Sequence, residues 1–545
     1  MITEAKVRTL TIRLLRKEFN SATAFSDNFS RDSKRALNLR KWEGVEGAEL
    51  FIGQIFAKPP SWISFLQEQS KELPDDLIAS GAGAVLFLPV EDRILALCFG
   101  HAHMTLNDDA FERQFGLKVT LNAVPRNGLR SLDLATPDAV TFQKRVQASK
   151  DSDVQDFGVD MLRDLARVAG GTPSDKVFAK FIAGRDSLSI TCSVNSSGLV
   201  EKCKQILSMY LADEYKKQFS WVDNLQVELR KDVLEKLDKK LAKALASMRA
   251  GVPTDLHMAP PEVVSYEEGS LLHYNGFGST GAHFYSLSIE DYIGELNRCR
   301  CQDDICKIKE KHRIRAKSSI SDEFNEKWKV YDCFTYETHL GSGKKQQNYV
   351  LFAGVWYAID KSFKKKVDNH FAAIRKVTII GHTSCKNERE LIADLHANRP
   401  DLLMLDQEKI NPKGVRYANI EPCDFLSKNK EFIHLKDGHS SGPISHLWSQ
   451  GIVSAEALVS DSDFRSKLRA IVKSKKRGFE KYIPKGNEKI VREQYTAVYG
   501  IMRKPYADGS FDIPFFSKVS LQAACERLEQ FNIGVALEII PKPAN

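Results

Sequence analysis

Residues 420–436, with the sequence IEPCDFLSKNKEFIHLK, predict two neighbouring β-strands separated by a short polar break. Asp424 closes the first apolar run, and Lys436 stands two positions after His434 in the second. A helical run follows at residues 445–458. Two adjacent strands can bring a carboxylate and an ammonium group to one place, where together they would hold a cation and a phosphate. What the sequence suggests about function therefore depends on this hairpin.

The composition is that of a folded and weakly basic protein. The chain has 545 residues, of which 42% are hydrophobic and 28% charged, and its formal net charge is +8. This length exceeds what a single hydrophobic core supports, so we expect roughly two to four domains. The basic bias is compatible with a nucleic-acid partner.

The cysteines and the apolar segments indicate the cytoplasm. The ten cysteines are scattered along the chain, so we expect reduced thiols. Charged residues interrupt the first 16 positions, which argues against a signal peptide. No apolar run approaches the ~20 residues that a transmembrane helix needs. We therefore expect a cytoplasmic protein without a membrane partner.

Hydrophobic periodicity predicts a multidomain chain of mixed α/β (α+β) class. Alternating runs predict strands at residues 83–89 and 93–100, and an apolar stripe at residues 229–248 predicts a long helix. Shorter patterns predict a strand at residues 117–124 and a helix at residues 157–168. We predict four regions: an N-terminal α/β domain at 1–135, a mainly helical region at 136–255, a β-rich region at 256–370, and a C-terminal mixed sheet flanked by helices at 371–545.

The C-terminal region has a distinctive order of predicted elements. A helix at residues 387–396 precedes a strand at 402–406, the two strands of the hairpin, and a helix from residue 444. This order resembles the core of the restriction-endonuclease-like nucleases, the PD-(D/E)XK superfamily. The spacing is also similar, with nine residues between Asp424 and the His434-x-Lys436 motif. The later pattern of strand, helix and strand at 496–503, 521–530 and 533–540 would complete the sheet.

The resemblance implies a metal-dependent nuclease site. It places Asp424 at the end of the second core strand and Lys436 on the third, and it expects a Glu from the first helix, here Glu388 or Glu390. Carboxylates supply oxygen ligands to Mg²⁺ or Mn²⁺, and the cation makes hydroxide available at neutral pH. Asp424 would hold the divalent metal together with Glu421 or a first-helix Glu, and Lys436 would orient the attacking water.

His434 departs from the superfamily pattern, which has Glu or Asp at that place. An imidazole is a poor Mg²⁺ ligand. Three explanations remain: His434 contacts a softer ion such as Mn²⁺, it transfers a proton, or the site has lost catalysis and kept binding. A hairpin with charged ends and no chemistry is the plain alternative.

A second family resembles the same residues. Phospholipase-D-like nucleases use a His-x-Lys motif with a histidine nucleophile, followed by a Ser/Asn-rich turn. His434-x-Lys436 and Ser440-Ser441 are similar to that pattern. Such sites need two His-x-Lys elements, and this chain has one.

Most of the chain resembles a larger family as well. Its features are the segments at 115–123, 354–357, 421–424, 434–436 and 445–451. They are similar to sporadically distributed bacterial proteins of unknown function, about 550 residues long, that are found near restriction and other anti-phage genes. This resemblance implies a role in anti-phage defence, a nucleic-acid partner (DNA is favoured) and partner proteins of the same defence system.

A basic segment follows the predicted nuclease helix. Residues 465–485 carry nine lysines and arginines and one acid, Glu480. Within this segment we expect nucleic acid to bind at Lys473, Lys475, Lys476, Arg477 and Lys481. The competing hypothesis from another class is a non-catalytic sensor or adaptor that recognises nucleic acid or a phage protein through its N-terminal domains.

Overall fold

The structure is a computed structural model. It describes residues 4–30, 32–60, 63–67, 77–137, 141–264, 270–278, 281–301, 304–318, 324–411, 419–438, 441–504 and 511–543. Ser440 of the alternative His-x-Lys motif lies outside the described residues.

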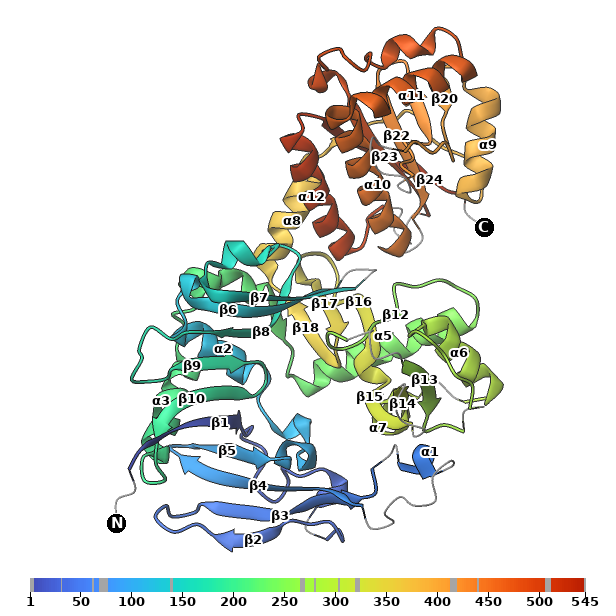
Figure 1. The fold of residues 1–545 in the computed structure, drawn as a ribbon. Helices are drawn as coiled ribbons and strands as arrows, with labels where there is room; N and C mark the ends of the chain where they lie inside the picture. The colour runs from blue at the N-terminus through green and yellow to red at the C-terminus, as the bar shows by residue number, and fades with distance from the viewer. Residues whose placement is uncertain are drawn as a thin grey trace.

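The N-terminal part is built on one large antiparallel sheet (Figure 1). Its ten strands are ordered β2-β3-β4-β5-β1-β10-β9-β8-β6-β7. The strands are β1 Lys6–Leu14, β2 Asn38–Lys41, β3 Glu49–Lys58, β4 Ala79–Val90, β5 Arg93–Gly100, β6 Leu129–Thr136, β7 Phe142–Ser152, β8 Leu165–Gly171, β9 Phe181–Gly184 and β10 Leu188–Val194. The accompanying helices are α1 Ile63–Gln67, α2 Phe115–Ala123, α3 Leu199–Leu211 and α4 Lys216–Phe219.

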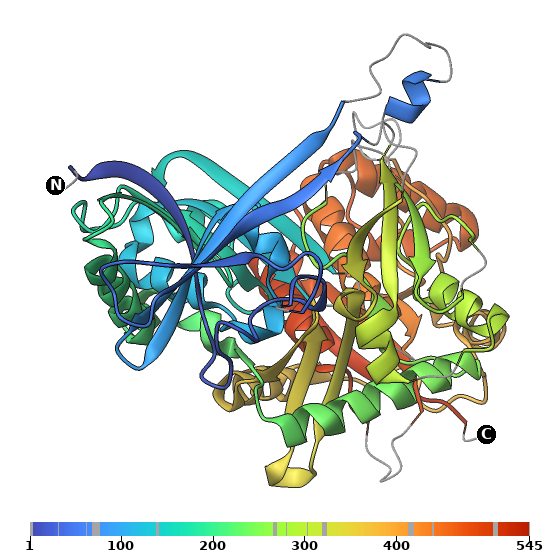
Figure 2. The ribbon, with the colours of Figure 1, turned by 90° about the horizontal axis from the view of Figure 1, so that it is seen from below.

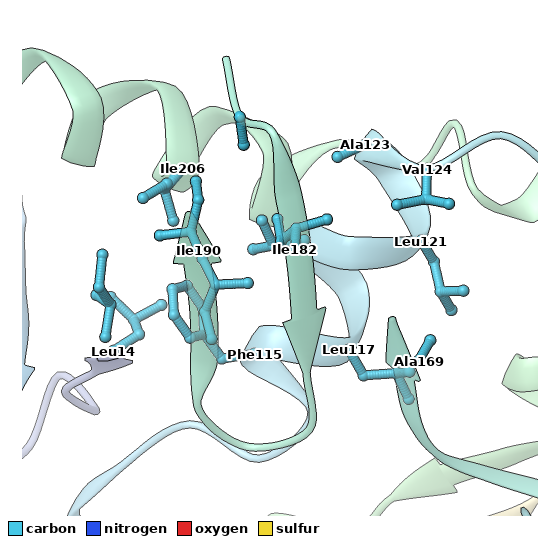
Figure 3. Close-up of a cluster of buried hydrophobic side chains, with 14 of the residues drawn as sticks. Leu14, Phe115, Leu117, Leu121, Ala123, Val124, Ala169, Ile182, Ile190 and Ile206 are labelled. Atoms are coloured by element: carbon cyan, nitrogen blue, oxygen red, sulfur yellow. The ribbon is translucent and has the colours of Figure 1, made fainter. Parts of the chain in front are cut away.

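The helices α2 and α3 close the core of this sheet. Figure 3 shows Phe115, Leu117 and Leu121 of α2 among side chains of the strands, including Ile182 and Ile190. α2 approaches the β9–β10 turn so closely that a Cβ on Gly116 would lie 2.0 Å from the carbonyl oxygen of Ser187. Glycine at this position therefore allows helix and sheet to make backbone contact.

Two local predictions in this part were wrong. Residues 117–124 form most of helix α2 instead of a strand, because an apolar run buried on nearly all sides carries no clear period. Residues 157–168 were predicted as a helix, but a 3-10 turn ends at Phe157 and strand β8 begins at Leu165. The large sheet also runs across residue 135 through β7–β10, so the predicted division there does not separate two sheets.

The middle part contains two smaller sheets. One is ordered β11-β18-β17-β16-β12 and the other β13-β14-β15. The strands are β11 Leu225–Val227, β12 His257–Met258, β13 Ser270–Asn275, β14 Arg313–Ser318, β15 Asn325–Lys329, β16 Phe334–Leu340, β17 Gln347–Phe352 and β18 Val355–Ile359. The helices are α5 Lys231–Arg249, α6 Ile289–Arg298 and α7 Ile305–Lys311, and α8 Lys361–Ala373 leads to the C-terminal part. The apolar stripe predicted for α5 is confirmed, since Val233, Leu237, Leu241 and Leu245 are buried.

The C-terminal part is a mixed sheet ordered β19-β24-β23-β22-β21-β20. The pairs β22–β23, β23–β24 and β24–β19 are parallel, whereas β21 is antiparallel to both of its neighbours, β20 and β22. The strands are β19 Arg375–Lys376, β20 Leu402–Met404, β21 Phe425–Ser427, β22 Glu431–Asp437, β23 Thr496–Arg503 and β24 Gly534–Pro541. The helices are α9 Glu388–Asn398, α10 Ser441–Ser460, α11 Ser462–Lys475 and α12 Phe515–Gln530.

The alternation of β22 separates the two faces of this sheet. Ile433 and Leu435 pack with Leu391 and Leu395 of α9, whereas Phe432 lies in the core that contains α10 and α12. The predicted elements occur in the expected order, but the structure adds helix α11 between α10 and β23. The mixed α+β class predicted for the whole chain is confirmed.

The three parts meet around the first turn of α12. Phe515 and Phe516 belong to an apolar cluster with Phe352 of β17 and Leu165 of β8. The Glu337 carboxylate on β16 accepts hydrogen bonds from the backbone N–H groups of Phe515 (2.6 Å) and Phe516 (3.1 Å), so the middle sheet caps a C-terminal helix. Figure 2, seen from below, shows the C-terminal part behind the N-terminal and middle parts. Within the described residues, every helix is too short or too polar to cross a membrane.

Candidate active site

Three carboxylates gather where β20 ends and β21 begins. Asp406, Glu421 and Asp424 each offer an oxygen atom within 4.8 Å of the others. The backbone fixes this arrangement, since Leu405 N–H (2.7 Å) and Asp406 N–H (3.1 Å) donate to the carbonyl oxygen of Asp424. Asp424 was expected to close a strand, but it lies one residue before β21. Pro422, which has no N–H to donate to a ladder, explains why pairing starts later.

Asp424 is held as a buried carboxyl group. Its residue is 9% exposed, and its Oδ2 accepts a hydrogen bond from the backbone N–H of Leu435 at 2.5 Å. Burial raises the pKa of Asp424 to about 8, and repulsion from Glu421, Asp406 and Glu388 acts in the same direction, while the Leu435 N–H lowers it. Burial and the crowded negative charge therefore favour the protonated form of Asp424 at neutral pH.

Glu421 lies in the same electrostatic environment. Its Oε1 accepts a hydrogen bond from the backbone N–H of Gln407 at 2.6 Å. Burial raises the pKa of Glu421, Asp406 raises it further, and the positive charge of Lys436 partly offsets the effect. Two neighbouring carboxyl groups with raised pKa values are a feature of functional sites.

Lys436 connects this cluster to helix α9. Its Nζ donates to Glu388 Oε1 at 2.9 Å, and the backbone N–H of Asp437 donates to Glu388 Oε2 at 3.2 Å. The side chains of Lys436 and Glu388 are 27% and 26% exposed, so solvent reaches the pair. Asn387 caps α9 and places Glu388 in its first turn, next to the end of β22.

Most of the site residues predicted from the sequence thus come together. We call Asp406, Glu421 and Asp424 the carboxylate cluster. Lys436 and Glu388 lie beside it as an ion pair. Asp406 was not predicted as a site residue, although a carboxylate directly after the apolar strand 402–405 was a signal that could have found it. Glu390 lies elsewhere, because its carboxylate accepts hydrogen bonds from Lys386 N–H and Asn387 Nδ2, both at 2.8 Å, in the cap of α9.

The carboxylate cluster fits a hard divalent cation. Asp406, Glu421 and Asp424 would be its ligands, since Mg²⁺ and Mn²⁺ prefer carboxylate oxygens. A cation bound there would supply a polarised phosphate oxygen and a hydroxide near neutral pH.

His434 is not part of the carboxylate cluster. The residue is 3% exposed and lines a cavity of about 10 Å³ between β22, β23 and α10, together with Phe432, Gly451, Ser454 and Tyr495. Within the described residues, its Nε2 has no hydrogen-bond partner. Burial lowers the pKa of His434 to about 4. A neutral imidazole enclosed in this way is placed for packing rather than for metal binding or proton transfer.

His434 should make the stability of the fold depend on pH. A histidine whose folded-state pKa is depressed stabilises the fold above its unfolded value of 6.5, and this contribution is lost as pH falls towards 4. Lowering the pH from 7 to 5 should cost about 2 kcal/mol of unfolding free energy through His434. Urea unfolding of His434→Gln should show a flatter pH dependence than wild type, whereas the exposed control His446→Gln should match wild type. Equal pH dependence in all three proteins would contradict this role.

The basic segment lies against the loop that carries Asp406. Lys475 on α11 forms an ion pair with Glu408 at 2.7 Å, and Lys467 donates to the Asn411 carbonyl at 3.0 Å. Lys476 donates to the Pro400 carbonyl at 2.7 Å. Lys473, Arg477 and Lys481 are exposed. Part of the predicted nucleic-acid surface therefore anchors α11 to the cluster loop, and the rest presents positive charge to solvent.

Comparison with known proteins identifies a family whose function is unknown. The chain matches a family of unknown function (DUF6119) over residues 10–541. Because the match spans nearly the whole chain, the protein belongs to this family. No curated protein and no solved structure matches it.

Proposed function

We propose that the protein is a metal-dependent nuclease that hydrolyses phosphodiester bonds in nucleic acid, with DNA as the favoured substrate. The observation that carries the proposal is the carboxylate cluster with the Lys436 ammonium beside it. Carboxylates that share a cation, together with a lysine at the same strand edge, are the groups that phosphodiester hydrolysis requires.

Each residue of the cluster has a role in this proposal. Asp406, Glu421 and Asp424 hold the cation and keep its charge at the scissile phosphate. Lys436 orients the attacking water and stabilises the negative charge that develops on the phosphate. Glu388 is a positioning residue, because it fixes the Lys436 Nζ at 2.9 Å and the Asp437 N–H at 3.2 Å. To act as a ligand, the buried carboxyl of Asp424 would have to give up its proton.

The topology supports a restriction-endonuclease-like domain. α9 packs on one face of the sheet, α10 on the other, and β20, β21 and β22 form an antiparallel meander followed by the parallel strand β23. The order of these elements is the one expected from the PD-(D/E)XK resemblance. His434 stands where the superfamily has a carboxylate, and Asp406 and Glu421 offer carboxylates from the neighbouring loop instead. The cluster thus retains enough acidic ligands despite the departure.

The burial of His434 disfavours the phospholipase-D-like alternative. A histidine nucleophile must reach the phosphorus atom, and the His434 ring is enclosed between β22 and α10. The sensor or adaptor hypothesis remains the competing function, since the exposed cations of α11 could bind nucleic acid without cutting it. We propose, from the family resemblance stated above, that either activity would serve anti-phage defence together with partner proteins of that system.

Incubation with plasmid DNA and with RNA separates the two functions. In Mg²⁺ or Mn²⁺ we expect cleavage that EDTA abolishes. Salt-sensitive binding without cleavage under any of these metals would overturn the nuclease and support the adaptor.

The exposed cations of the basic segment should contribute to binding DNA. Replacing Lys473, Arg477 and Lys481 together by Ala removes three charges that could neutralise phosphates. The slope of log affinity against log salt should fall by about 2–3. Fluorescence anisotropy in Ca²⁺ with a labelled duplex measures this slope. The matched control replaces Lys231, Lys239 and Lys243, which are exposed on α5. An equal change of this slope in both triple variants would contradict a specific role of the basic segment in binding DNA.

A further inference from the structure

A second polar cavity lies where the N-terminal sheet meets the middle sheet, far along the chain from the carboxylate cluster. It has a volume of about 20 Å³. Its walls come from the residues before α2, from β8, from the β9–β10 turn and from the β17–β18 hairpin. These elements are neighbours in Figure 1, where β8 and β9 lie beside α2 and close to β18.

Arginines dominate the charge of this cavity. Arg113, Arg167 and Arg185 line it, against a single lining carboxylate, Asp186. Asp186 is shared, since it lies 3.3 Å from Arg113 and 3.9 Å from Arg185. The three guanidinium groups together lower the pKa of Asp186 against the opposing effect of burial. Arg113 also forms an ion pair with Asp109 at 3.1 Å, outside the lining of the cavity, so two carboxylates pair with three cations and one positive charge is left over.

Arg167 is the least satisfied of the three. Its guanidinium donates to the hydroxyl of Tyr357 and to the carbonyl of Pro261, both at the long distance of 3.4 Å, and it stacks on the Phe352 ring at 5.2 Å. Among the described residues, no carboxylate lies within ion-pair distance of Arg167. Burial lowers the pKa of Arg167, and the positive charges of Arg185 and Arg113 lower it further. A half-buried cation without a carboxylate partner is stabilised by an anion.

The same cavity receives the positive end of a helix. Gln114 is the N-cap of the nine-residue helix α2, and it lines the cavity together with Arg113. Asp186 Oδ1 accepts the Gln114 N–H at 2.8 Å, which shows that this helix end already binds one negative group. The helix dipole and the planar guanidinium forks both favour an oxyanion, and two arginines can each bind a phosphate through paired hydrogen bonds.

We propose that this cavity binds a phosphoryl group at the junction of the N-terminal and middle sheets. A volume of this size holds one or two water-sized groups, so the cavity would take one or two phosphoryl oxygens while the rest of the ligand lies at its mouth, on the side of Arg185, whose side chain is 39% exposed. The ligand is inorganic phosphate or the phosphate of a small phosphomonoester such as a nucleotide. Because the ligand would contact both sheets, its binding stabilises their junction.

Calorimetric titration with inorganic phosphate and with AMP, at constant chloride ionic strength, tests this site. Wild type should bind at least one of the two probes saturably, and the ligand should raise its melting temperature. Arg167→Gln and Arg185→Gln should each weaken binding by at least about tenfold, as the loss of a charge-assisted contact predicts. Tyr357→Phe tests the same pocket by removing only a hydroxyl, and we expect a smaller loss.

Arg130→Gln is the matched control, because Arg130 is 44% exposed and pairs with Asp151 on the surface. It should bind as wild type does. Preference for phosphate over AMP would identify the free ion, and the reverse preference would identify the phosphomonoester. Absence of saturable binding of both probes to wild type would overturn the site. Wild-type affinity in folded Arg185→Gln and Arg167→Gln would overturn it equally.

Discussion

Lys436→Met should abolish nucleic-acid cleavage while the protein stays folded and keeps its cation. The ammonium group that orients the water and stabilises the developing charge is removed, and such groups contribute about 10²–10³-fold in rate. The structural cost is small, because Lys436 and Glu388 are about a quarter exposed and their ion pair is screened by solvent. Single-turnover cleavage of a labelled duplex in Mn²⁺ measures the loss, and thermal unfolding verifies the fold.

The matched control for this variant is Lys428→Met. Lys428 is exposed in the turn between β21 and β22. The substitution therefore removes a lysine from the same hairpin and leaves the carboxylate cluster unchanged. Its cleavage rate should equal that of wild type. A Lys436→Met protein that cuts DNA at the wild-type rate would exclude Lys436 from the chemistry.

Asp424→Asn should make the metal-free protein more stable and also inactive. A carboxyl whose folded-state pKa is raised from 3.8 to about 8 stabilises the fold at low pH, and this contribution is lost as the pH rises through 8. At pH 8 in EDTA, the neutral amide should therefore gain on the order of 5 kcal/mol over wild type. For a domain the size of the C-terminal part this corresponds to a rise of roughly 10–20 °C in melting temperature.

Binding of the cation should reduce or reverse the difference in stability between wild type and Asp424→Asn. Excess Mn²⁺ stabilises the wild-type carboxylates and has less to bind in Asp424→Asn, so the difference between the two proteins should shrink or change sign. Asp394→Asn, on the exposed face of α9, is the control and should behave as wild type in both conditions. An Asp424→Asn protein less stable than wild type in EDTA at pH 8 would contradict the crowded, buried carboxyl described above.

Local sequence patterns predicted most of the order of helices and strands in the C-terminal part, for physical reasons. Its strands are short apolar runs with clear breaks, and α9 begins with a capping Asn387, so the order of elements could be read residue by residue. The resemblance predicted Glu388 or Glu390 as a further metal ligand, whereas the carboxylate of Glu388 pairs with Lys436. Asp406 was missed because its place depends on the pairing of β20 with β21, across a long intervening loop. The position of Asp406 at the end of an apolar run was a local signal, but the pairing that brings it to Glu421 and Asp424 leaves none.

The errors in the remaining chain have similar causes. α2 is buried on nearly all sides, so its sequence FGLKVTLNA shows no amphipathic period and its β-branched residues favoured a strand. His434 was expected in the site because of its motif, but the alternation of β22 places Phe432 and His434 towards α10. Lys436 escapes this constraint because it stands at the end of the strand and its long side chain reaches Glu388.

The carboxylate cluster can be tested most directly with crystals grown or soaked in Mn²⁺ at pH 8. The anomalous scattering of manganese locates the ion without assumptions about activity. We expect an anomalous peak within coordination distance of Asp406, Glu421 and Asp424, and we expect this peak to be lost in Asp424→Asn. Saturating Mn²⁺ that leaves this place empty, or that binds only elsewhere on the protein, would contradict it.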